Sequence, residues 1–229
     1  MTLGTAYTAL GAGVLVWAFL VRSLRARPWQ TKDAVGALHE GGETSLTPQR
    51  IGLFTFLAVI SSLFGLFIAA YHMRMMDGIA NGDWVHYKVP GILWFNTAVL
   101  MLGSATMQWA KGAAERGEFA PLRTRLIAGG ALTGGFLLLQ LLAWRELGAD
   151  GFLSVRNPAI AFFYLLTAVH GLHLVGGLAV WGYTLRRLAA PTAPAVRVKD
   201  VRQVVGLCTL YWHYLMLVWL VLFGLMLST

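Results

Sequence analysis

The sequence predicts an all-α fold, a polytopic bundle of membrane-spanning helices. Of its 229 residues, 57% are hydrophobic and only 12% are charged, whereas about a quarter of the residues in a soluble domain are charged. The apolar runs are about 20 residues long and lack the alternation that is typical of membrane barrel strands. Because backbone polar groups must be satisfied inside lipid, we expect these runs to be α-helices.

Six apolar segments are long enough to span a membrane. They cover residues 4–21, 51–71, 90–110, 125–144, 158–185 and 203–227. The first segment lacks a preceding basic residue and an evident small-residue cleavage site, so we expect a retained helix rather than a signal peptide. The predicted organisation is an N-terminal transmembrane helix with a cytoplasmic loop over 1–49, followed by a five-helix core over 50–229.

The basic residues predict how the six helices are oriented. The loops 22–50, 111–125 and 186–202 would lie on one side of the membrane, and they hold 14 of the 18 Lys and Arg residues. The positive-inside rule places these loops in the cytoplasm and both termini outside. This distribution explains the net charge of +8, and we therefore expect no nucleic-acid partner.

The acidic residues and the single cysteine exclude several classes of function. All ten Asp and Glu residues lie in loops or at the ends of the predicted spans. Because proton pumps and cation transporters usually carry a carboxylate at membrane depth, we expect no proton movement through the core of this chain. Cys208 is alone, so neither an intrachain disulfide nor a cysteine-based metal centre can form.

Three histidines inside predicted spans are the candidate functional residues. His170 and His173 share one face of one helix, so they could not ligate opposite sides of one haem, although His213 could pair with either. A metal site would need a further ligand nearby, and the spans carry no carboxylate. We favour hydrogen bonds to adjacent helices or to nearby hydroxyls, such as those of Tyr164 and Thr167. The alternative is a stand-alone membrane haem or metal protein that uses all three histidines.

Two further patterns concern helix packing. Gly130 and Gly134 form a small-xxx-small pattern that allows two helices to approach closely. Trp212 and Trp219 are seven residues apart, so they face the same way on the last span. We expect both tryptophans to make packing or lipid contacts rather than to hold a cofactor.

Four stretches in order resemble subunit III of the haem–copper oxidases, the cytochrome c oxidase family. They are RIGLFTFLAVISSLFGLFIAAYH (50–72), PGILWFNTAVLMLGSATMQWA (90–110), FFYLLTAVHGLHLVGGL (162–178) and LYWHYLMLVWLVLF (210–223). The resemblance implies a five-helix core, here with one extra N-terminal helix, in a multi-pass protein of the bacterial inner membrane. It implies no catalytic, cofactor-binding or metal-binding residue in this chain, with haem and copper in partner subunits.

The resemblance also implies partners and lipid contacts. Such a subunit assembles with oxidase subunits I and II in a complex that reduces O₂ during aerobic respiration, and it holds phospholipid between its helices. Tyr71, His72 and Arg187 occupy positions that contact lipid in that family, while His170, His173 and His213 become structural hydrogen-bonding residues. The closest alternative is the equivalent subunit of a nitric oxide reductase or quinol oxidase. The sequence names neither the electron donor nor the haem type.

The sequence departs from that family at four places where the family carries a carboxylate at membrane depth. They are Val59–Ile60, Ala143, Gly206 and Met216. The missing carboxylates argue against a role in proton uptake. We therefore expect a scaffold that braces subunit I and holds lipid.

Overall fold

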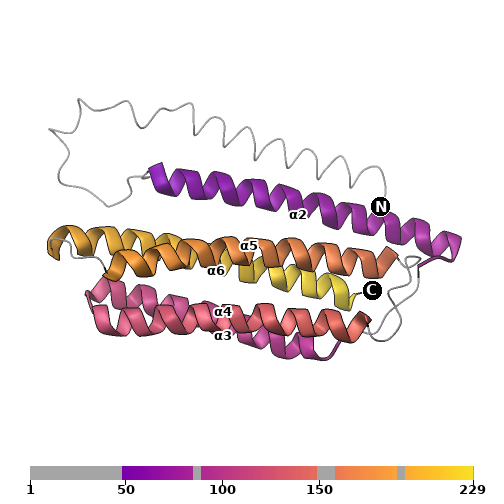
Figure 1. The fold of residues 1–229 in the computed structure, drawn as a ribbon. Coiled ribbons are helices and arrows are strands. Elements are labelled where there is room, and N and C mark those ends of the chain that lie inside the picture. The colour runs from indigo at the N-terminus through magenta and orange to yellow at the C-terminus, as the bar shows by residue number, and fades with distance from the viewer. Residues whose placement is uncertain (1–47, 85–88, 149–157, 190–193, 229) are drawn as a thin grey trace, which may run out of the picture. The chain divides into compact units, whose positions relative to one another are not determined.

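The structure, a computed structural model, describes residues 48–84, 89–148, 158–189 and 194–228, without the side chains of Arg187, Ala189 and 194–200. The described residues form five α-helices and no strand, so the all-helical prediction is confirmed (Figure 1). The helices are α2 (Pro48–Asn81), α3 (Ile92–Arg116), α4 (Phe119–Leu147), α5 (Pro158–Ala189) and α6 (Pro194–Leu227). The expected span at 4–21 lies outside the described residues. The count of six spans, the boundary at residue 49 and the side of each terminus therefore stay predictions.

Four of these helices are long and apolar enough to cross a membrane. They are α2, α4, residues Pro158–Arg186 of α5 and residues Val201–Leu227 of α6. Helix α3 has 25 residues, which is enough length for a hydrocarbon core of about 30 Å. Asn96 and Gln108 lower its mean hydropathy, because both amides lie within its apolar run.

Helices α3 to α6 pack on one another, and α2 lies against α5 and α6 (Figure 1). The turn between α3 and α4 shows how the sequence produces one of these pairs. Gly117 has a φ of 75°, a left-handed conformation that favours glycine. The N–H groups of Gly117 and Glu118 donate to the carbonyls of Ala114 and Ala113. Arg116 donates two hydrogen bonds to Glu118 across this turn. These hydrogen bonds are the main reason that the pKa of the Glu118 carboxyl group is lowered.

Helix α2 is longer than the predicted span 51–71, because it continues to Asn81. Beyond the helix end, Asp83 and Trp84 fold back, and both of their N–H groups donate to the carbonyl of Gly78. A Cβ atom on Gly78 would lie 2.9 Å from Asp83 Oδ1 and 3.0 Å from Trp84 Cβ, so this return needs glycine. Arg74 forms an ion pair with Asp83, and their hydrogen bond is the main reason that the pKa of Asp83 is lowered.

The small residues of α4 separate into two roles. A Cβ atom on Gly130 would lie 2.3 Å from Trp181 Cζ2 of α5, whereas a Cβ atom on Gly134 would meet nothing within 4 Å. The indole of Trp181 also donates to the carbonyl of Leu126 at 2.8 Å. Of the two glycines in the Gly130–Gly134 pattern, only Gly130 therefore allows a close approach. What approaches it is the indole of Trp181 from α5.

These two glycines allow a matched test. We expect Gly130→Ala to destabilise the bundle by about 1–3 kcal/mol, because the indole of Trp181 must leave its place. Gly134→Ala should be neutral or stabilise by up to about 1 kcal/mol, because alanine favours helix. Unfolding of both variants in detergent micelles measures the difference, and equal effects would show that Trp181 is not held against Gly130.

Candidate functional site

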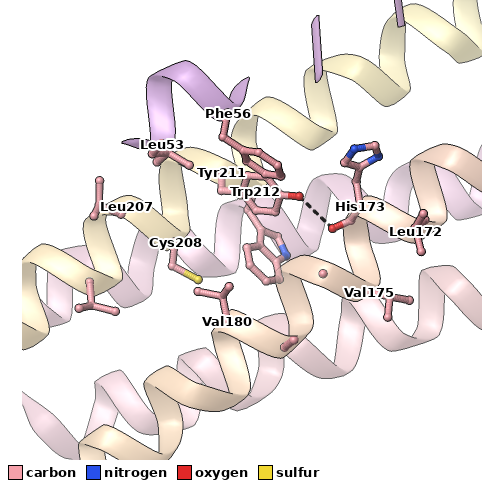
Figure 2. Close-up of a pocket in the computed structure, with 13 residues that line it drawn as sticks. Leu53, Phe56, Leu172, His173, Val175, Val180, Leu207, Cys208, Tyr211 and Trp212 are labelled. Atoms are coloured by element: carbon pink, nitrogen blue, oxygen red, sulfur yellow. Dashed lines mark hydrogen bonds between the residues drawn. The ribbon is translucent and has the colours of Figure 1, made fainter. Parts of the chain in front are cut away.

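An apolar groove with a volume of about 650 Å³ lies between α2, α5 and α6 (Figure 2). Leu53 and Phe56 of α2 line one side, and Cys208, Tyr211 and Trp212 of α6 line another. This volume is within the usual range for sites that bind small ligands, which are mostly apolar with a few polar groups.

Two adjacent glycines on α5 help to create the groove. A Cβ atom on Gly177 would lie 2.8 Å from Cε1 of Tyr211, so glycine at this position lets α6 approach α5. Gly176 lines the groove, and a Cβ atom there would meet nothing within 4 Å. One glycine therefore brings two walls together, while the other leaves space between them.

His173 lines this groove from α5, and its hydrogen bonds define its tautomer. Its Nδ1 atom lies 2.7 Å from the carbonyl oxygen of Val169. Because a carbonyl only accepts, Nδ1 carries the hydrogen, and in this tautomer Nε2 is an acceptor. The ring lies 5.7 Å from that of Phe64, and the hydroxyl of Tyr211 donates to the backbone oxygen of His173 at 2.9 Å (Figure 2).

His170 lies one helical turn before His173 and is fully buried. Neither of its ring nitrogens has a hydrogen-bond partner among the described residues. Its ring packs against Phe136 at 5.8 Å and Trp219 at 5.3 Å between ring centroids. The expected hydrogen-bonding role is therefore not found for His170, which is enclosed by aromatic rings instead.

The two hydroxyls that were candidate partners for His170 are engaged elsewhere. The hydroxyl of Tyr164 donates to the carbonyl of Trp144 at 3.0 Å. The hydroxyl of Thr167 donates to the carbonyl of Phe163 at 2.7 Å and accepts from the indole of Trp144 at 2.9 Å. Both hydroxyls thus link α5 to Trp144 of α4, and the hydroxyl of Thr167 also bonds to the backbone of α5.

His213 joins α6 to α3. Its Nε2 atom lies 3.1 Å from Oε1 of Gln108, and its Nδ1 atom contacts the hydroxyl of Ser104. Donation from Nε2 to the amide oxygen makes Nδ1 the acceptor from Ser104. His213 thus bonds to α3, whereas His173 lines the groove. No group of three His, Cys, Asp or Glu residues in the described part of the chain could hold a metal ion.

The three expected lipid-contact residues are placed differently from one another. Tyr71 is only 1% exposed, and its ring packs edge-on against Trp84 at 5.3 Å and Phe162 at 5.5 Å. This burial argues against a headgroup contact at Tyr71. His72 is half-buried beside it, and the side chain of Arg187 lies outside the described residues. Lipid contacts at His72 and Arg187 stay predictions.

Three hydrogen bonds between tryptophan and threonine join the helices of the core, and the sequence reasoning missed them. In each bond an indole N–H donates to a threonine hydroxyl at 2.9 Å, and that hydroxyl donates to the carbonyl four residues earlier. The pairs are Trp144–Thr167 between α4 and α5, Trp212–Thr133 between α6 and α4, and Trp219–Thr97 between α6 and α3. The spacing of Trp212 and Trp219 predicted packing, but a single sequence does not show which threonines they meet.

Comparison with known proteins gives curated relatives but no matching family model. The chain is 29% identical to the probable cytochrome c oxidase subunit 3 of Mycobacterium tuberculosis over 188 residues, which cover 77% of this chain and 86% of that protein. It is 28% identical to the probable cytochrome c oxidase subunit 3 of Nocardia farcinica, with coverage of 77% and 87%. It is 25% identical to the cytochrome bo(3) ubiquinol oxidase subunit 3 of Pseudomonas aeruginosa, with coverage of 81% and 85%. The predicted resemblance to oxidase subunit III is thereby confirmed.

Proposed function

Because this chain is a homologue of the subunit 3 proteins of cytochrome c and bo(3) ubiquinol oxidases, we propose that it is a non-catalytic membrane subunit of a haem–copper terminal oxidase. The observation that carries the proposal is the extent of the similarity, since the alignment covers more than four fifths of each relative. A match of that extent indicates similarity along most of both chains rather than a shared motif. The proposed location is the bacterial inner membrane.

The chemistry of the core supports a structural rather than a catalytic role. The buried polar residues among those described are Asn, Thr, Ser, Gln and His, and they include no Asp, Glu, Lys or Arg. Neutral hydrogen bonds join α3 to α4 through Asn96 and Gln140, and α6 to α3 through Thr209. Because such bonds hold helices together in lipid, we propose that the chain braces subunit I, while subunits I and II carry the haem and copper.

The groove supports a second part of the proposal, which is that the chain holds lipid. Its lining is almost entirely apolar, and it is bounded by α2, α5 and α6, each of which contains a candidate membrane span. An apolar groove in a membrane bundle suits the acyl chains of a phospholipid. The similarity to a ubiquinol oxidase subunit supports a second candidate function, in which the host complex oxidises quinol instead of cytochrome c.

Affinity purification of the tagged chain from its native membranes in mild detergent tests this proposal. We expect two further membrane subunits to co-purify in a fixed ratio and to carry all the haem and copper of the complex. Turnover with reduced cytochrome c or with quinol then separates the two kinds of oxidase. A Soret band that stays with this chain after it is separated from its partners would instead support the stand-alone haem protein.

A further inference from the structure

The imidazole of His173 offers an open hydrogen-bond acceptor at membrane depth. Its Nδ1–H bonds to Val169, and its Nε2 atom has no hydrogen-bond partner among the described residues. His173 lies near the middle of the candidate span Pro158–Arg186, about 20 Å along the helix from either end at 1.5 Å per residue. Water and lipid headgroups are therefore distant, and an acceptor left unpaired in hydrocarbon is unfavourable.

The other polar side chains that line the groove either already have hydrogen-bond partners or are weak hydrogen-bond donors. The hydroxyl of Tyr211 donates to the backbone of His173, and the indole of Trp212 donates to Thr133. The thiol of Cys208 is free, but a thiol is a poor donor. The groove therefore presents one strong acceptor in an apolar lining, which is complementary to an apolar molecule with a single strong donor.

The aromatic lining of the groove indicates that the ligand's donor group is carried by an aromatic ring. The rings of Phe56 and Tyr211, which both line the groove, have centroids 6.1 Å apart and planes inclined by 29°, and the indole of Trp212 lies beside them (Figure 2). Flat aromatic rings pack favourably against such side chains. A phenolic hydroxyl is also more acidic than an aliphatic one, so it donates a stronger hydrogen bond to an imidazole nitrogen.

We infer that this groove binds a lipid-soluble phenol with one hydroxyl and an alkyl tail, whose hydroxyl donates to Nε2 of His173 while its ring packs against Phe56 and Tyr211. The alkyl tail lies along the apolar side chains of α5 and α6, such as Val180 and Leu207. The inference deepens the proposed lipid-holding role of the groove. It does not depend on the partnership with oxidase subunits.

Photolabelling of the full chain in lipid nanodiscs, with its co-purifying subunits, tests the inference. The probes are a photoreactive long-chain alkylphenol, its methyl ether and an alcohol of the same chain length. One interhelical-type hydrogen bond in a membrane is worth about 0.6–2 kcal/mol, so the phenol should label the groove about threefold to thirtyfold more efficiently than the ether. The alcohol should lie between them. Equal labelling by all three probes would show a site for acyl chains only and would overturn the inference.

Variants of the chain test whether the probes bind in the groove, and they separate the apolar contacts from the hydrogen bond to His173. Gly176→Leu fills the groove where a side chain meets open space, so it should abolish labelling by every probe. Gly134→Leu adds the same bulk at another open position on α4 and should change nothing. His173→Leu should keep the labelling by the ether but remove the preference for the phenol. Unchanged labelling in Gly176→Leu, or a retained preference in His173→Leu, would overturn the inference, and neither result bears on which oxidase subunits co-purify.

Discussion

Replacing Trp219 with alanine is expected to destabilise the helix bundle by on the order of 3 kcal/mol. This indole is fully buried, lies between Phe136 at 4.8 Å and His170 at 5.3 Å, and donates to Thr97. Its removal leaves a cavity among α3, α4, α5 and α6 and breaks the bond between α6 and α3. Dispersion and hydrogen bonding, which hold membrane helices together, are therefore lost at the same place.

The measurement is unfolding in mixed micelles, followed by loss of helical circular dichroism. Trp109→Ala is the matched control, because it deletes the same side chain at a position that is 61% exposed. Trp219→Phe should lose less than Trp219→Ala, since it keeps most of the packing but not the hydrogen bond to Thr97. A similar loss of stability at Trp109 and Trp219 would contradict the packing of the core described above.

The sequence predicted the described helices well but placed several of their ends too early or too late. Hydropathy marks where a chain crosses hydrocarbon, whereas a helix ends where its backbone finds another partner. The span predicted at 90–110 became a helix to Arg116 because the left-handed Gly117 ends it there. Likewise α2 continues to Asn81, and its return is built around Gly78 and the ion pair of Arg74 with Asp83.

The candidate site was only partly predictable, because it depends on how the helices are rotated against one another. The sequence singled out His173 and His213, but the partners of His213 on α3 are more than 100 residues away along the chain. The groove arises from the different roles of Gly176 and Gly177, which a sequence pattern does not distinguish. Ile60, at one of the missing carboxylate positions, is buried on α2, so an apolar side chain packs in the core at that place.

The largest functional effect is expected when the whole chain is removed from its proposed complex. An oxidase that lacks this subunit should keep its haem spectrum and its initial turnover, because the catalytic groups are proposed to lie in the partner subunits. It should assemble less well or lose activity faster during turnover, because the face of subunit I that we propose this chain braces would lose its cover. Assembly yield and the half-life of activity, measured with and without the chain, quantify this effect.

Proton pumping distinguishes a scaffold from a participant in proton uptake. The described core holds buried polar groups but no buried carboxylate, and a proton path through a membrane bundle usually needs one. The ratio of protons pumped to electrons transferred, measured in the first turnovers, should therefore be nearly unchanged without the chain. The complex reassembled with the Trp219→Ala variant should have an intermediate lifetime and the same ratio, because only its packing is weakened. A ratio near zero in an intact complex that lacks the chain would refute the scaffold role, since the chain would then take part in proton movement without a carboxylate.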